Sequence, residues 1–128
     1  MRLLLDTRVL LWASGRPGML SKTARRLLDD TDNELHFSAA SLWEIEIKRG
    51  LGRNGFQVDP RLLRHGLLHN GYQELTVSGA HAVAVNLLPP IHTDPFDRML
   101  IAQAMVEAIT LVTADPTMAR YPGPVHVV

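Results

Sequence analysis

Short apolar runs recur along the chain, separated by longer segments in which apolar positions follow a helical period. Five runs are predicted to be β-strands: Arg2–Leu5, Leu35–Ser38, Glu74–Val77, Thr110–Thr113 and Val125–Val128. The runs Leu-Leu-Leu and Thr-Leu-Val-Thr are continuous rather than alternating, which is typical of parallel strands buried on both faces. The pattern therefore indicates a sheet that is covered on both sides.

Capping residues and helix breakers predict helices between these runs. The predicted helices are Val9–Ala13, Ser21–Asp30, Ser38–Gly50, Pro60–His69, a segment from the Ser78 cap to Pro89, and a segment that starts at Asp94-Pro95. Strands that alternate with helices in this way predict an α/β fold with a mostly parallel central sheet.

The predicted helix Ser38–Gly50 carries an acid within an apolar face. At helical spacing, Ala40, Trp43, Glu44 and Ile47 fall along one side. This spacing predicts that Trp43 packs in the core. It also predicts that Glu44 lies on or beside the buried stripe.

Length and composition fit one globular domain, which we expect to span residues 1–128. The chain has no cysteine, which excludes disulfides, thiolate catalysis and cysteine-bound zinc or iron–sulfur sites. The apolar start is interrupted at Asp6 and Arg8, and no segment approaches the length needed to span a bilayer. We therefore expect a soluble cytoplasmic protein.

The charge balance is neutral, with thirteen basic and thirteen acidic side chains. Proteins that depend on phosphate contacts are usually basic, so the net charge argues weakly against nucleic acid. Basic residues still gather in the first half of the sequence, at Arg25, Arg26, Lys48, Arg49, Arg53, Arg61 and Arg64. They could form a local basic surface, although solvated helix faces are the simpler explanation.

Four acids occupy positions that a parallel sheet would bring together. Asp6 follows the first strand directly, and Asp115 comes one residue after the strand Thr110–Thr113. Ligand sites of open α/β sheets lie beyond the carboxyl ends of the strands, where the strand order reverses. If these two strands are neighbours there, their acids meet. Glu44 and Asp97 fall in the first turns of two helices and would reach the same end of the sheet.

Each acid also has a purely structural explanation. Asp94, followed by a proline, is a strong N-cap, and Asp97 completes an acidic capping pattern. Asp115 can cap in the same way, Asp6 can open a turn, and Glu44 can pair with a lysine four residues on. Capping by Asp94 leaves Asp97 only partly explained. Capping of any kind does not explain Asp6 at the end of a buried strand, or Glu44 within an apolar helix face.

Gathering these carboxylates would favour a bound metal ion. Carboxylates in a poorly solvated cleft repel one another and raise one another's pKa, and a divalent cation among them removes this cost. Oxygen ligands, without cysteine or a required histidine, suit Mg²⁺, with Mn²⁺ as a substitute. We therefore predict that Asp97 belongs to a metal site while Asp94 caps its helix.

The segments that contain these acids resemble the PIN-domain ribonucleases, and specifically the VapC toxins of prokaryotic type II toxin–antitoxin systems. Four segments carry the resemblance, in the order LLLDTRVLLWA, SAASLWEIEIKRGLGR, HTDPFDRMLIAQA and TLVTADPTMARYPG. It implies a single PIN domain, a three-layer α/β/α arrangement around a mostly parallel sheet of four to five strands. It also implies a catalytic metal site formed by Asp6, Glu44, Asp97 and Asp115, with Thr113 supplying the hydroxyl that precedes the last acid.

The resemblance further implies a Mg²⁺-dependent endoribonuclease that hydrolyses RNA phosphodiester bonds as the toxin of a VapBC-like pair. The expected partners are an RNA substrate, a VapB-like antitoxin whose tail covers the acidic cleft, and a second copy of the chain in a homodimer. Arg8 and Arg98 are candidates for phosphate contacts, with surface ion pairing as the alternative. His92 could touch substrate, although a loop position without a role is the simpler explanation.

One departure from the family and two other functions stay open. Such toxins commonly read Asp-Thr-His in the first block, whereas this chain has Arg8 as the third residue. The first alternative function is a catalytically silent PIN-like protein that binds RNA or a partner. The second is a phosphotransfer protein, although an aspartate-nucleophile phosphatase needs an Asp-x-Asp that Asp6-Thr7-Arg8 does not provide.

Overall fold

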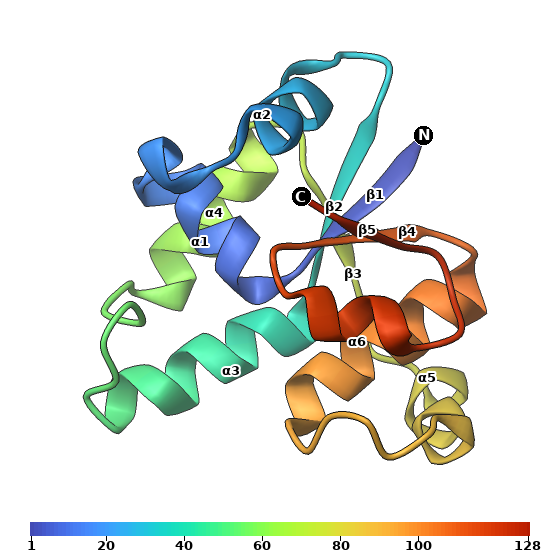
Figure 1. The fold of residues 1–128 in the computed structure, drawn as a ribbon. Helices are drawn as coiled ribbons and strands as arrows, with labels where there is room; N and C mark the ends of the chain where they lie inside the picture. The colour runs from blue at the N-terminus through green and yellow to red at the C-terminus, as the bar shows by residue number, and fades with distance from the viewer.

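A parallel sheet of five strands forms the centre of the molecule (Figure 1). The computed structural model describes residues 1–128. The strands are β1 (Arg2–Leu5), β2 (Glu34–Ser38), β3 (Gln73–Leu75), β4 (Thr110–Thr113) and β5 (Val125–Val127). Their spatial order is β3-β2-β1-β4-β5, and every neighbouring pair is parallel. The predicted α/β fold is confirmed, with β3 lying slightly earlier in the sequence than expected.

Helices cover both faces of this sheet, as the three-layer prediction required (Figure 1). One face carries α1 (Thr7–Gly15), α2 (Lys22–Asp29) and α4 (Pro60–His69), and the other carries α5 (Gly79–Ala84) and α6 (Pro95–Glu107). Helix α3 (Ala39–Gly50) follows β2 directly and contacts α1, α4 and α6. The short 3₁₀ helices are η1 (Pro17–Met19), η2 (Val85–Leu87) and η3 (Pro116–Arg120). None of the helices combines the length and apolarity that crossing a membrane requires.

Alternation along β1 divides the hydrophobic core into two clusters. Leu3 and Leu5 pack on the side of α1, α3 and α4, in a cluster that also contains Phe37 and Ile45. Leu4 faces the opposite side, where it packs with residues of α6, β4 and η3 in the second cluster. A strand that is fully buried on both faces explains why its sequence is a continuous apolar run.

The strand order reverses at β1. Strands β2 and β3 lie on one side of it, and β4 and β5 lie on the other. Leu5 pairs in register with Val112, and the Asp6 N–H donates a hydrogen bond to the Val112 carbonyl at 3.0 Å. Asp6 and Thr113 therefore lie level with each other at the carboxyl ends of adjacent strands. This is the adjacency that the convergence of the acids requires.

The prediction that Trp43 packs in the core is wrong. The buried residues of α3 are Ala40, Ser41, Glu44 and Ile45, whereas Trp43 is 65% exposed. Successive residues of a helix are rotated by about 100°, so a buried face centred on Ser41 and Ile45 leaves Trp43 outside it. Trp43 instead meets the ring of Phe96 edge-on, with ring centroids 5.5 Å apart. Glu44 is the sixth residue of α3 and lies in its second turn, rather than in the first turn that the sequence predicted.

A core histidine lacks hydrogen bonds. Neither ring nitrogen of His36 in β2 has a partner, and the residue is buried. Its position pairs in register with Leu4, at the centre of the sheet. Burial, assisted by the charge of Arg2, lowers the pKa of His36 below its ordinary value.

We expect acid to destabilise the fold through this residue. Below about pH 6.5 the unfolded chain protonates at His36 while the folded chain resists, so the free energy of unfolding falls as the pH falls. Replacing His36 with leucine should remove this part of the pH dependence, measured by urea denaturation near neutral pH and near pH 5. His65→Leu, at an exposed position of α4, serves as the control. Identical pH dependence in the wild type and the His36 variant would contradict this account.

Candidate metal centre

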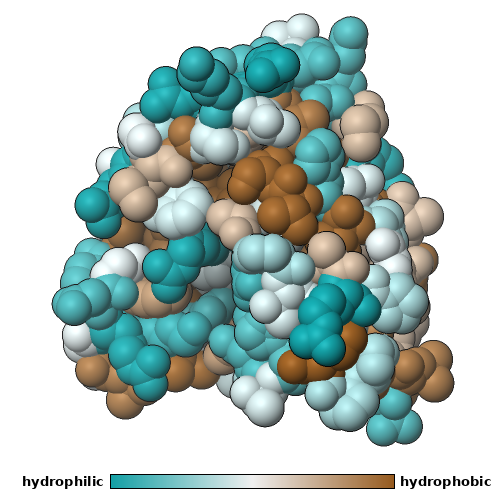
Figure 2. Space-filling model, in the orientation of Figure 1, coloured by the Kyte–Doolittle hydropathy of each residue, from teal (hydrophilic) through white to brown (hydrophobic).

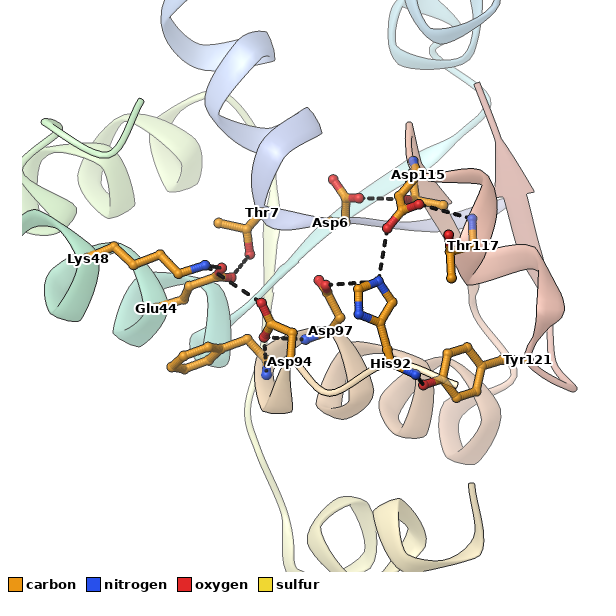
Figure 3. Close-up of polar contacts among 12 residues, drawn as sticks. Asp6, Thr7, Glu44, Lys48, His92, Asp94, Asp97, Asp115, Thr117 and Tyr121 are labelled. Carbon is orange, nitrogen blue, oxygen red and sulfur yellow. Dashed lines mark hydrogen bonds and ion pairs between the residues drawn. The ribbon is translucent and has the colours of Figure 1, made fainter. Parts of the chain in front are cut away.

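The four acids named from the sequence line one pocket at the carboxyl ends of β1 and β4. The pocket has a volume of about 350 Å³. Five carboxylates line it, those of Asp6, Glu44, Asp94, Asp97 and Asp115. Figure 3 shows that these side chains come from separate segments of the chain and approach a common space. The structure thus brings together residues that are up to about a hundred positions apart in the sequence.

Two hydrogen bonds fix the Asp6 carboxylate at the end of β1. Its Oδ1 accepts the Val9 N–H at 2.8 Å, which makes Asp6 the N-cap of α1, and its Oδ2 accepts the hydroxyl of Thr113. The view that capping has no part in placing Asp6 is therefore wrong. Burial raises the pKa of Asp6 above its ordinary value, so ionising this carboxyl in the folded protein has a cost.

Thr113 joins the first and last acids of the site. Its hydroxyl donates to Asp6, and the same oxygen accepts the N–H of Asp115 at 3.1 Å. Asp115 also caps η3, because its Oδ1 accepts the Thr117 N–H at 2.9 Å. A β-branched hydroxyl residue at the end of a buried strand thereby sets the relative positions of two carboxylates.

Asp97 is the carboxylate with the least support from the protein. Asp94 caps α6 as predicted, accepting the N–H groups of Phe96 and Asp97 at 2.8 and 3.3 Å. The Asp97 side chain accepts no hydrogen bond within the protein, and its nearest basic atom is Nε2 of His92, 3.7 Å away. Burial, followed by the neighbouring carboxylates of Asp94 and Glu44, raises the pKa of Asp97 to about 7. A bound cation would relieve this repulsion at Asp97. Capping does not explain the position of Asp97, because Asp94 already caps the helix.

Both carboxylate oxygens of Glu44 already have partners. Its Oε1 lies 2.5 Å from the hydroxyl of Thr7, which is itself 2.9 Å from the hydroxyl of Ser41. Its Oε2 forms an ion pair with Lys48, one turn further along α3. The pairing that the sequence offered as a structural explanation is therefore present, inside the pocket rather than on a solvated helix face.

His92, for which a loop position without a role was the simpler explanation, lies beside the acids of the site. Its Nε2 lies 3.0 Å from Oδ2 of Asp115, and its backbone N–H donates to the hydroxyl of Tyr121 at 2.6 Å (Figure 3). The hydrogen bond raises the pKa of His92 and holds the pKa of Asp115 below its usual range. His92 precedes the Asp94 cap by two residues, and that spacing was the available signal that it lies near the helix start.

The two arginines proposed for phosphate contacts lie in different places. Arg8 lines the pocket and its guanidinium lies 5.8 Å from the centre of the Phe56 ring. Arg98 does not line the pocket. It donates instead to the carbonyls of Pro89 and Val85 at 2.9 and 3.1 Å, which ties α6 to the preceding segment. The prediction for Arg98 is corrected accordingly, because its guanidinium is committed to the backbone.

The donors in the pocket fit a divalent cation. Ligand atoms of His92, Asp97 and Asp115 all lie within 4.8 Å of one another, and the Asp6 carboxylate lines the same pocket. Carboxylate oxygens are the ligands that Mg²⁺ and Mn²⁺ prefer, and an imidazole nitrogen is accepted more readily by transition metals. Hydrogen bonds that orient ligands from behind, as seen for Asp6 and Asp115, are typical of metal sites.

Replacing Asp94 with alanine separates capping from metal binding. We expect the free energy of unfolding to fall by about 1 kcal/mol, because α6 loses its N-cap. The stabilisation of the protein by Mn²⁺, measured by thermal unfolding with and without the metal, should persist. Loss of the response to Mn²⁺ would show instead that Asp94 is a ligand.

Comparisons with known proteins agree with this fold. The PIN domain family model matches residues 3–124. The structure of VapBC2 from Rickettsia felis bound to a promoter DNA fragment is 14% identical, with a TM-score of 0.72, and the match covers 100% of this chain and 99% of that one. DNA-bound VapBC from Salmonella typhimurium is 16% identical with a TM-score of 0.67, and the match covers 99% of this chain and 98% of that one. VapBC-1 from nontypeable Haemophilus influenzae is 18% identical with a TM-score of 0.60, and the match covers 94% of this chain and 91% of that one. No curated protein matches the sequence.

Proposed function

Because the chain belongs to the PIN domain family, we propose that it is a divalent-metal-dependent endoribonuclease that hydrolyses phosphodiester bonds in RNA. One observation carries the proposal: Asp6, Glu44, Asp97 and Asp115 line a single pocket where the strand order reverses. Mg²⁺ is the proposed metal, with Mn²⁺ as a substitute, since carboxylates supply most of the ligands.

Three acids are proposed to hold the metal ion. Asp6 and Asp97 are assigned as direct ligands, and Asp115 as a further ligand or as the holder of a water. The bound ion would lower the pKa of a water molecule and stabilise charge that develops on the phosphate. Thr113 keeps Asp6 and Asp115 in register through the two hydrogen bonds of its hydroxyl. His92 orients Asp115 from the other side.

Glu44 is assigned a role through water or as a base, because Thr7 and Lys48 already engage its two oxygens. Arg8 is the proposed phosphate contact, since it lines the pocket and is exposed. A neutral net charge is compatible with this function because recognition of single-stranded RNA relies on shape, stacking and local charge. Half-buried Trp12, which also lines the pocket, offers a ring for such stacking.

We further propose that the chain is the toxin of a VapBC-like pair in a prokaryotic cytoplasm, silenced by a VapB-like antitoxin. The VapBC structures that share the fold support this assignment. A homodimer is proposed from the exposed apolar residues Trp43, Ile47 and Leu51, which recur every four residues along α3 and its C-cap. Figure 2 shows apolar side chains at the lower left edge of the molecule, where α3 lies. Light scattering of the purified chain tests the oligomeric state.

Incubation of the purified chain with structured RNA tests the nuclease proposal. Cleavage should require Mg²⁺ or Mn²⁺ and stop when EDTA is added. Sequencing the 5′ ends of RNA fragments after induction in cells would then identify the target. RNA that is bound but never cut, with either metal present, would favour the catalytically silent alternative.

A further inference from the structure

Lys48 places a fixed positive charge inside the acidic pocket. Its ammonium pairs with Oε2 of Glu44 and lies 3.7 Å from Oδ2 of Asp94. The rings of Phe56 and Phe96 lie beside it, with 4.8 and 5.9 Å between the nitrogen and the ring centres. Two carboxylates and two aromatic faces therefore hold this ammonium in place.

This ion pair differs from an ordinary pair on a solvated helix face. Glu44 is 3% exposed, and the side chain of Lys48 is only 20% exposed. A carboxylate buried to this extent is costly unless a positive charge and hydrogen bonds compensate it. Thr7 supplies the hydrogen bond to Oε1, and Lys48 supplies the charge at Oε2.

The remaining carboxylates of the pocket are not paired with a lysine or an arginine. Asp97 and Asp115 have only His92 within ion-pair distance, and the hydrogen bonds of Asp6 come from neutral groups. Figure 3 shows the Lys48 pair and the His92 contact on opposite sides of Asp97. The pocket thus has one half in which a lysine partly offsets two carboxylates, and one half in which no lysine or arginine forms an ion pair.

We propose that Lys48 occupies the place of a second cation, so that the chain binds one divalent metal ion rather than two. This inference rests on the proposed function, because it takes the acidic pocket as the metal site. The ion binds at the half formed by Asp6, Asp97 and Asp115. A second ion would need Glu44 and Asp94, which already form ion pairs with the ammonium, and it would be repelled by that ammonium at close range. Lys48 is on this account a positioning residue that sets the number of metal ions.

Counting bound Mn²⁺ tests the inference without measuring activity. Electron paramagnetic resonance of free Mn²⁺, together with calorimetry, gives the number of ions bound per chain at millimolar metal. We expect one ion for the wild type and one for Lys48→Arg, which keeps the charge. Lys48→Met should bind two, because Glu44 and Asp94 then lack a cation. Lys22→Met, which removes the other lysine of the chain at an exposed position of α2, is the matched control and should bind one.

Two bound ions in the wild type would overturn the inference while leaving the proposed nuclease intact. A single ion in a folded Lys48→Met variant would also overturn it, and circular dichroism establishes whether that variant is folded. If the Lys48→Met variant does not fold, the numbers of ions bound by the wild type and by Lys48→Arg decide the question. No bound ion in the wild type would contradict the proposed function as well, so the two failures are distinguishable.

Discussion

Replacing Asp97 with asparagine is expected to abolish RNA cleavage while leaving the fold intact. Groups that merely orient metal ligands are worth about 10–100-fold in activity or metal affinity, so loss of a direct ligand should exceed about 100-fold. The substitution preserves the size of the side chain, and Asp94 still caps α6. The amide should also stabilise the metal-free protein, because it removes the carboxylate whose pKa burial and its neighbours raise to about 7.

Two measurements check this expectation. RNA cleavage at saturating Mg²⁺ gives the loss of activity, and thermal unfolding in EDTA above pH 7 gives the gain in stability. Asp32→Asn, at an exposed turn outside the pocket, is the control and should change neither. Full activity in the Asp97 variant would return this residue to a capping role and remove it from the site.

Divalent metal is expected to raise the melting temperature of the free wild-type protein. A ligand that binds only the folded state stabilises it by about 2.7 kcal/mol when its concentration is 100 times the dissociation constant. The effect should be pronounced here because the metal also relieves repulsion among carboxylates whose pKa values are raised, those of Asp6 and Asp97. The response should be largely lost in the Asp97→Asn variant.

Thermal unfolding with Mg²⁺, with Mn²⁺ and with NaCl at matched ionic strength measures this response. NaCl should produce no comparable shift, because screening of surface charges does not replace a bound ion. Absence of any shift at millimolar Mn²⁺ would count against a metal site in this pocket.

Much of the architecture could be predicted because local signals agree with the global fold. The continuous apolar runs of β1 and β4 require burial on both faces. A serine cap marks the start of α2, and an aspartate cap followed by proline marks the starts of α4 and α6. Asp6 and Asp115 could be placed beside each other because both follow strands, and because parallel strands end on the same side of a sheet. The position of an acid relative to its strand is local information that the fold preserves.

Other features depend on tertiary packing that periodicity does not determine. Trp43 stands next to the buried Glu44 in α3, and one residue rotates the side-chain direction by about 100°, which is enough to take Trp43 from the core to solvent. His92 contacts Asp115, and its backbone N–H donates to the hydroxyl of Tyr121; both partners lie far along the chain. The i, i+4 spacing predicts that Lys48 pairs with Glu44, but only the folded chain brings Asp94 and the aromatic rings to the same ammonium.

Arg98 illustrates the limit of motif reading for charged residues. It stands beside Asp97 in the sequence, yet its side chain points to the carbonyls of Val85, in η2, and of Pro89, just after η2. Adjacent residues on a helix face different directions, so proximity to a predicted ligand does not place a side chain in the site.

Mn²⁺ located by anomalous diffraction in crystals grown with the metal tests the central claim most directly. A peak is expected within coordination distance of Asp97 and of Asp6 or Asp115, on the side of the pocket away from Lys48. Crystals in which Mn²⁺ is absent from this pocket, or in which it binds only elsewhere on the molecule, would contradict the account.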